Sequence, residues 1–157
     1  MDPLIRLYFE RAENEIVLSE MLFKVSSDEK QKEFLKIEKE FTFYSAVINH
    51  SYYSIFYCAK AYLLSKGIRV KMPKEHKKAY WEFAKLVKRG IVDKELLRIY
   101  EDAMIKADSL LQIFKAEKGK RGIFTYERLP QANKQPAFES LENAKKFFKS
   151  VYNIISV

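Results

Sequence analysis

The segment from Phe43 to Gly67 constrains the fold of this chain more than any other. It consists of helix-forming and aromatic residues and contains no Gly or Pro before Gly67. Such a run predicts a long helix that is apolar nearly all round and therefore buried. Asn49, His50 and Ser51 lie in the middle of it. Polar groups there need hydrogen bonds inside a bundle, a contact between subunits, or a role in a site.

The rest of the chain also predicts helices, because it has only four Gly and four Pro in 157 residues and apolar residues at helical spacing. We predict a single all-α domain over residues 1–157, an up-and-down four-helix bundle with an extra short helix. The expected elements are a helix from Pro3 or Leu4 to about Val25, a helix over 28–66 with a possible break near Glu40–Thr42, a loop over 68–73, a short helix over 74–88, a helix from Asp93 to about Lys118, a long connection, and a last helix from Pro136 to about Ile155.

The net charge of +8 is unevenly distributed along the chain. Residues 66–89 contain nine Lys and Arg against two Glu, and a second basic stretch covers residues 115–134. This asymmetry favours a polyanionic partner, with nucleic acid the first choice, and we expect the basic side chains to converge on one groove. The alternative is that the lysines only solvate the outer faces of helices.

Other features of the composition exclude several classes of protein. Cys58 is the only cysteine, which excludes an intrachain disulfide framework. With only two histidines in addition, a His/Cys metal cluster is excluded, and we expect no metal and no cofactor. The longest apolar run is interrupted by Lys60 and is too short to span a membrane, and the N-terminus does not resemble a signal peptide. We therefore expect a cytoplasmic protein.

Two groups of residues are candidates for a site in the first two thirds of the chain. Asn49, His50 and Tyr53 form a polar cluster on the long helix, where His50 either bonds a neighbouring helix or belongs to a site. Arg69 and His76 are separated by six residues. Near a scissile phosphate, such an Arg would stabilise the phosphorane and such a His would move a proton. Lys71 and Lys74 belong to the same basic loop, in which His76 can equally be incidental.

The segment KGKRGIFTYERLP supplies the third group. Its cations can hold phosphates, and Phe124 and Tyr126 can stack on bases. The alternative is a basic loop whose aromatic side chains pack into the core. The predicted phosphate-binding residues of the chain are Arg69, Lys71, Lys74, Lys118, Lys120, Arg121 and Arg128; the catalytic candidates are Arg121, Tyr126, His50 and His76.

Four segments of the chain together resemble the HEPN family, the small helical "higher eukaryote and prokaryote nucleotide-binding" domains. They are RLYFERAENEIVLSEMLF, SAVINHSYYSIFYCAKAYLLSKGIRVK, RGIFTY and SLENAKKFFKSV. The resemblance implies a helical bundle that pairs as a homodimer. Many relatives accompany a minimal nucleotidyltransferase and act as the RNase half of a toxin–antitoxin pair, using an Arg followed after four to six residues by a His. Here Arg121 is followed after four residues by Tyr126, whose phenol is a poor base at neutral pH.

Three functions follow from these observations. The leading hypothesis is a dimeric HEPN-like protein that binds nucleotide or RNA and works with a minimal nucleotidyltransferase in a toxin–antitoxin-type system. In this hypothesis Arg121 and Tyr126 line a cleft between subunits, with Asn49, His50 and Tyr53 beneath it. The second is a metal-independent endoribonuclease in which His50 or His76 moves the proton. The third is a non-catalytic dimeric adaptor bundle.

Overall fold

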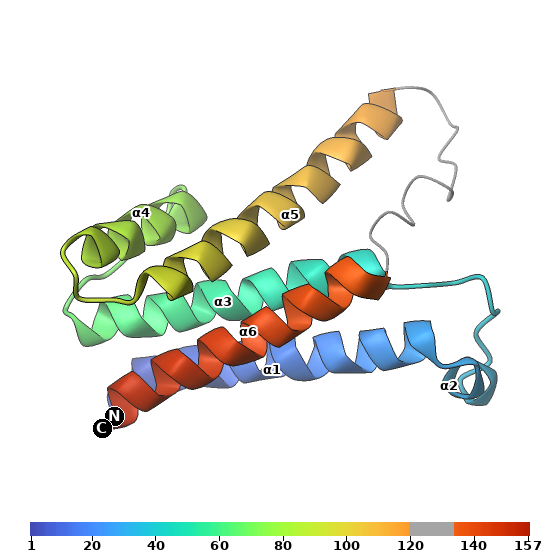
Figure 1. The fold of residues 1–157 in the computed structure, drawn as a ribbon, viewed down its shortest axis with the longest axis horizontal. Helices are drawn as coiled ribbons and strands as arrows, with labels where there is room; N and C mark the ends of the chain where they lie inside the picture. Colours follow the sequence, from blue (N-terminus) through green and yellow to red (C-terminus); the bar gives the residue numbers. More distant parts are fainter. Residues whose placement is uncertain (120–133) are drawn as a thin grey trace.

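The chain folds into an elongated bundle of helices in the computed structural model (Figure 1). The structure describes the backbone of residues 1–119 and 134–157 and the side chains of residues 1–108 and 134–157. In these ranges it contains six helices and no strand. The helices are α1 (Pro3–Ser27), α2 (Glu29–Phe34), α3 (Tyr44–Ser65), α4 (Glu75–Lys88), α5 (Lys94–Gly119) and α6 (Lys134–Ser156).

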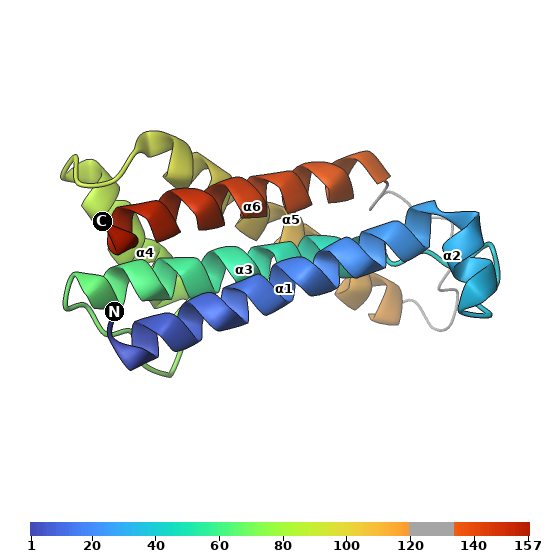
Figure 2. The same ribbon diagram turned by 90° about the horizontal axis from the view of Figure 1, so that it is seen from below.

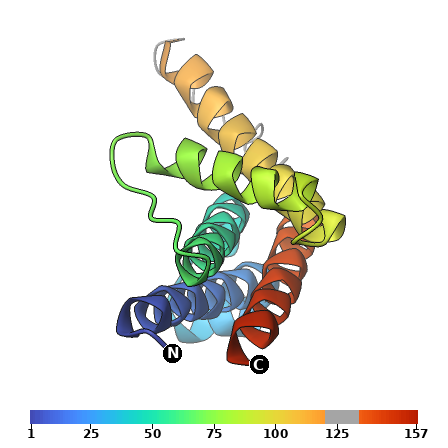
Figure 3. The same ribbon diagram turned by 90° about the vertical axis from the view of Figure 1, so that its left-hand side faces the viewer.

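Helix α3 is the centre of the bundle and packs against α1, α4, α5 and α6. Figure 3 shows α3 between α1 and α6 on one side and α4 and α5 on the other. The four long helices alternate in direction along the bundle, while the short helix α4 lies across α3 (Figures 1 and 3). Contact on every side explains why Ile55, Cys58, Ala59 and Leu63 are fully buried. The predicted all-α bundle with an extra short helix is confirmed.

The predicted helix over residues 28–66 is two helices in the structure. Helix α2 ends at Phe34, and α3 begins only at Tyr44, so the break is earlier and longer than the one anticipated near Glu40–Thr42. Lys36 has a φ of 57°, which ends α2. The buried Lys32 then donates from Nζ to the carbonyl of Lys39 at 2.7 Å. These contacts fold the chain back in a short connection (Figure 2).

Several helix ends follow signals in the sequence, whereas α6 begins at Lys134, two residues before the predicted Pro136. Asp2, Asp28 and Asp93 each accept a hydrogen bond from the backbone N–H two residues later, at 2.7–2.9 Å. Gly67 and Gly90 follow α3 and α4 with φ of 76° and 72°. A residue with a side chain is strained in that conformation, so glycine ends these helices at low cost.

Buried aromatic rings join four of the helices. Phe83 of α4 contacts Tyr62 of α3, Tyr100 of α5 and Phe147 of α6, with ring centroids 5.6–6.0 Å apart. All four rings are almost completely buried. Tilted and edge-to-face aromatic pairs of this kind contribute about 0.5–1.5 kcal/mol each beyond burial of their area. This cluster fixes α4 across α3 and so sets the position of every side chain on α4.

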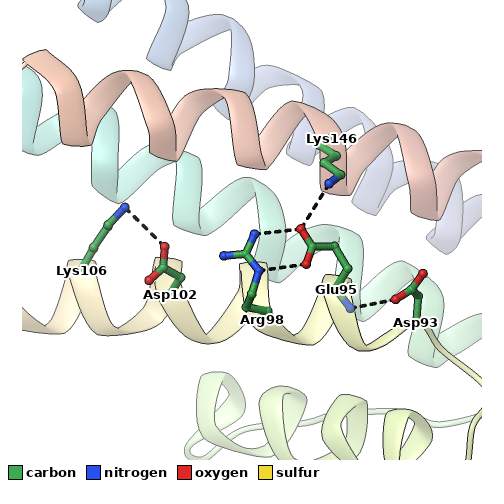
Figure 4. A network of polar contacts seen from close by, with 6 residues as sticks. All are labelled: Asp93, Glu95, Arg98, Asp102, Lys106 and Lys146. Carbon is green, nitrogen blue, oxygen red and sulfur yellow. Dashed lines mark hydrogen bonds and ion pairs between the residues drawn. The ribbon is translucent and has the colours of Figure 1, made fainter.

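A polar network on the surface joins α5 to α6 (Figure 4). Glu95 accepts two hydrogen bonds from Arg98 and a third from Lys146 of α6 at 3.2 Å. Lys106 lies 3.7 Å from Glu139 of α6. The Arg98 hydrogen bonds, followed by the one from Lys146, lower the pKa of Glu95 to about 2. Exposed charge pairs contribute little individually, so we expect this network to add only modestly to the contact between α5 and α6.

The hydrophobicity of the helices also bears on membrane insertion. Among the described residues, no helix has the length and apolar character that crossing a bilayer requires. Nor do these residues gather three or more potential metal-ligating side chains of His, Cys, Asp or Glu.

Candidate functional site

Two of the polar residues in the middle of α3, His50 and Ser51, face α1. Nδ1 of His50 lies 2.5 Å from Oε2 of Glu15, and the exposed fractions of the two side chains are 30% and 23%. Ser19 of α1 donates to the carbonyl of Val47, at 3.3 Å. His50 therefore bonds a neighbouring helix, one of the two alternatives open from the sequence. Glu15 was not anticipated, although its helical register with Ser19 placed it on the buried side of α1.

His76 lies on top of α3, in the first turn of α4. Its ring stacks on Phe56 with centroids 3.8 Å apart and an interplanar angle of 16°. Its Nδ1 lies 2.9 Å from the hydroxyl oxygen of Tyr52. Desolvation of the stacked ring lowers the pKa of His76, an effect that Glu75 opposes and Lys60 reinforces. The imidazole is therefore neutral at pH 7, with one ring nitrogen held in place by Tyr52.

Tyr53 connects the two histidines. Its ring centroid is 6.2 Å from that of His50 and 5.8 Å from that of His76, and the residue is 39% exposed. Two features singled out separately in the sequence, the polar cluster of α3 and the His of the basic loop, thus meet in one row across α3 and α4. Asn49, one turn before Tyr53 on α3, is half-buried.

A buried ion pair lies beside this row. Lys60 is only 9% exposed and forms a hydrogen-bonded pair with Glu75. Its Nζ also lies 4.5 Å from the ring centroid of Tyr8 and 5.5 Å from that of Phe56. Desolvation acts to lower the pKa of Lys60, but hydrogen bonds to Glu75 and Tyr8 outweigh it and raise the pKa. Sequence reasoning missed this pair. The available signals were a lone cation in an apolar helix and one of the two acidic residues in a basic stretch.

A small cavity opens next to Lys60, between the start of α1 and the end of α3. Its volume is about 150 Å³. Leu64 and Ile68 form part of an apolar wall, and Arg69 and Lys71 add two exposed cations. The arrangement suits an anionic group attached to a small apolar or aromatic body. The residues that line it are Leu4, Tyr8, Lys60, Leu64, Ile68, Arg69, Val70 and Lys71.

The structure places only part of the predicted phosphate-binding set. Arg69 and Lys71 line the cavity, and Lys74 is exposed just before α4. The backbone of Lys118 belongs to the last turn of α5. This end of α5 and the loop of residues 66–74 lie at opposite ends of the bundle (Figure 1). The side chains of residues 109–133 lie outside the described ones, so the predicted convergence of the two basic stretches on one groove stays a prediction. The predicted site residues outside the described ones are Lys120, Arg121, Phe124, Tyr126 and Arg128.

A comparison with protein families agrees with this architecture. A family model described as HEPN domain matches residues 29–156. The chain belongs to the HEPN domain family. This confirms the resemblance seen in the sequence and connects the chain with nucleotide- or RNA-related function. A comparison with curated proteins gave no match. The HEPN match begins after α1, so Tyr8 and Glu15 are contributed by a helix outside the matched range.

Proposed function

We propose that this HEPN protein binds RNA or a nucleotide through the cavity beside Lys60 and the basic loop that borders it. The observation that carries the proposal is a cavity with three cationic side chains, Lys60, Arg69 and Lys71, in a chain of this family. Glu75 already balances the charge of Lys60. Arg69 and Lys71 are exposed and available to a phosphate, which an Arg fork holds with two hydrogen bonds.

The walls of the cavity suit the rest of a nucleotide. Tyr8 presents an aromatic ring, fixed in place by the Lys60 ammonium above it and by a stacked contact with Tyr57 at 6.5 Å. Leu64 and Ile68 supply the apolar surface. A cavity of about 150 Å³ accommodates one ring rather than a whole nucleotide. The base or ribose would therefore enter, while the phosphate stays at the rim.

Two further elements of the proposal concern assembly. We place the protein in a homodimer and beside a minimal nucleotidyltransferase in a toxin–antitoxin-type system, with Arg121 and Tyr126 adding to the nucleic-acid contact. Family membership supports this, as does a group of exposed apolar residues on α1, Val17, Leu18 and Met21. Sedimentation equilibrium tests the dimer directly: a monomer at all concentrations would remove that part of the proposal.

Binding of labelled single-stranded RNA and of ATP tests the central proposal. The double variant Arg69→Gln/Lys71→Gln removes two cations at the rim of the cavity. The matched control, Lys24→Gln/Lys30→Gln, removes two exposed cations near the junction of α1 and α2, at the other end of the bundle (Figure 1). Arg121→Ala tests the contribution expected from the sequence.

We expect the rim variant to bind RNA at least tenfold more weakly than the control variant. Each phosphate contact to a single strand contributes about −0.7 to the slope of log K against log salt. Loss of two contacts should therefore make that slope less steep by about 1.4. Equal affinity of the rim and control variants would exclude the cavity, and weak binding with a flat salt response in the wild type would favour the adaptor.

Metal-independent RNA cleavage is a second candidate activity, favoured by the two fixed imidazoles at Tyr53. In that reaction the neutral His76 takes the proton of a ribose 2′-hydroxyl, whose oxygen attacks the adjacent phosphorus. The P–O5′ bond breaks, and O5′ takes a proton from His50. Incubation with tRNA should give fragments that disappear in His50→Ala and in His76→Ala. Intact tRNA with the wild type would rule this activity out.

A further inference from the structure

One side of α4 consists of lysines arranged around a single tryptophan. Trp81 is 51% exposed and is the only Trp of the chain. Lys77 and Lys78 lie one turn before it, Lys85 one turn after it and Lys88 two turns after it, and all are exposed. With about 100° of rotation per residue, these five side chains fall within an arc of about 100°. We call this surface the Trp81 face. The arc contains no acidic residue, and at its edge Glu82 accepts a hydrogen bond from Lys85 at 2.7 Å, which leaves Lys77, Lys78 and Lys88 as the cations free of a carboxylate partner among the described residues.

The opposite side of α4 already accounts for the packing of this helix. Ala79, Phe83, Leu86 and Val87 are buried in the main core. Trp81 touches Tyr80 at its edge, with ring centroids 5.4 Å apart, but half of its surface stays in water. A large aromatic ring left exposed among cations adds little to stability. Its position indicates a partner that offers both negative charge and a flat apolar surface.

We propose that the Trp81 face binds single-stranded nucleic acid, with a base stacked on Trp81 and the flanking lysines on phosphates. Unpaired bases expose their flat faces, and proteins bind them by combining aromatic stacking with a cationic track for the backbone. The proposal rests on the RNA binding inferred above and adds a second contact surface to it. Lys78 donates to the carbonyl of Lys71 at 3.3 Å, so this face adjoins the loop that borders the cavity.

Other anionic partners fit this face less well. A helix that lies on a membrane inserts its apolar side between lipids, but the apolar side of α4 is buried against the rest of the bundle. A nucleic-acid duplex keeps its bases stacked inside, so it offers charge but no free base face to Trp81. Anionic vesicles and a duplex are therefore the comparison ligands in the test.

Intrinsic fluorescence reports on this face without a label, because Trp81 is the only tryptophan. A short single-stranded oligouridylate is titrated into the full chain, and in parallel the same sequence as a duplex and vesicles containing phosphatidylserine. We expect quenching by the single strand at concentrations where the duplex and the vesicles leave the signal unchanged. Trp81→Ala, followed with a labelled strand, should lower affinity about fivefold or more, the range for loss of one stacked base.

The lysines are tested separately with Lys77→Gln/Lys88→Gln, which should make the salt slope less steep by about 1.4 for two lost phosphate contacts. Lys24→Gln/Lys30→Gln is again the matched control, and circular dichroism checks the fold of each variant. Unchanged RNA affinity in Trp81→Ala and in the lysine variant would overturn the Trp81 face and leave the cavity proposal intact. Quenching by vesicles alone would also overturn it. Failure of every form of the protein to bind RNA would remove both proposals.

Discussion

The pair of Lys60 and Glu75 gives a sharp test of the interior described here, because its two partners are buried unequally. The side chain of Lys60 is 9% exposed and that of Glu75 is 25% exposed. Breaking a buried ion pair by removing one partner costs about 3–5 kcal/mol, chiefly because the other charge is left buried and unpaired. The cost should therefore depend on which partner is removed.

Glu75→Gln leaves the ammonium of Lys60 in the interior, with Tyr8 and the introduced amide as its hydrogen-bond acceptors. We expect a loss of about 2–3 kcal/mol in the free energy of unfolding. This is less than the usual cost of breaking a buried ion pair, because the side chain of Glu75 is partly exposed to water. Lys60→Met leaves a carboxylate that water can reach, and it places an unbranched side chain against the rings of Tyr8 and Phe56. That substitution should cost about 1 kcal/mol or less.

Thermal unfolding followed by circular dichroism measures the difference. At about 2–4 °C per kcal/mol for a chain of this size, Glu75→Gln should lower Tm by about 4–12 °C, and Lys60→Met by less than about 4 °C. Because the pKa of Lys60 is raised above its ordinary value of 10.5, this contribution persists at neutral pH and is lost only as pH rises through the folded-state pKa. A larger loss in Lys60→Met than in Glu75→Gln would refute the reasoning. The double variant should be close to Lys60→Met.

Three other predictions concern single residues. Desolvation lowers the pKa of His76 below its ordinary value of 6.5, so the unfolded chain binds the proton more readily and the free energy of unfolding falls as pH drops through that value. In urea unfolding, His76→Gln should therefore lose less stability than the wild type between about pH 7 and 5. The hydroxyl of Tyr100 is buried without a hydrogen-bond partner among the described residues, so Tyr100→Phe should raise the free energy of unfolding by up to about 1 kcal/mol, and a clear loss would contradict this. Gly67 has a φ of 76° and open space around its Cα, so Gly67→Ala should cost about 1 kcal/mol through backbone strain alone, and Gly67→Asn should cost less.

Local chemistry made most of the fold predictable. Asp2, Asp28 and Asp93 mark helix starts, and Gly67 and Gly90 mark helix ends, because each signal acts within one turn of the backbone. The break between α2 and α3 depends on contacts between distant residues instead. Ser26 accepts a hydrogen bond from the backbone of Phe43 at 2.7 Å, across 17 residues. Helix propensity and hydrophobic periodicity do not indicate a hydrogen bond between residues so far apart.

The sequence singles out some residues of the candidate site but not their partners. His50 and His76 were candidates from the sequence, yet their partners Glu15 and Tyr52 are 35 and 24 residues away along the chain. Only the packing of α1 and α4 on α3 brings them together. The Trp81 face was open to sequence reasoning, since its helical spacing is visible. The net charge of the whole stretch does not indicate it, because that count does not distinguish the exposed side of the helix from the buried side.

The place of α1 has a practical consequence for work on related proteins. The region that identifies the family begins at residue 29, yet Phe9 is buried and makes edge-to-face contacts with Phe148 and Tyr152 of α6. A gene trimmed to the recognisable region would encode a bundle with an open apolar flank, and it would also lose Tyr8 and Glu15. The segment that identifies the family is therefore shorter than the segment that the complete bundle needs.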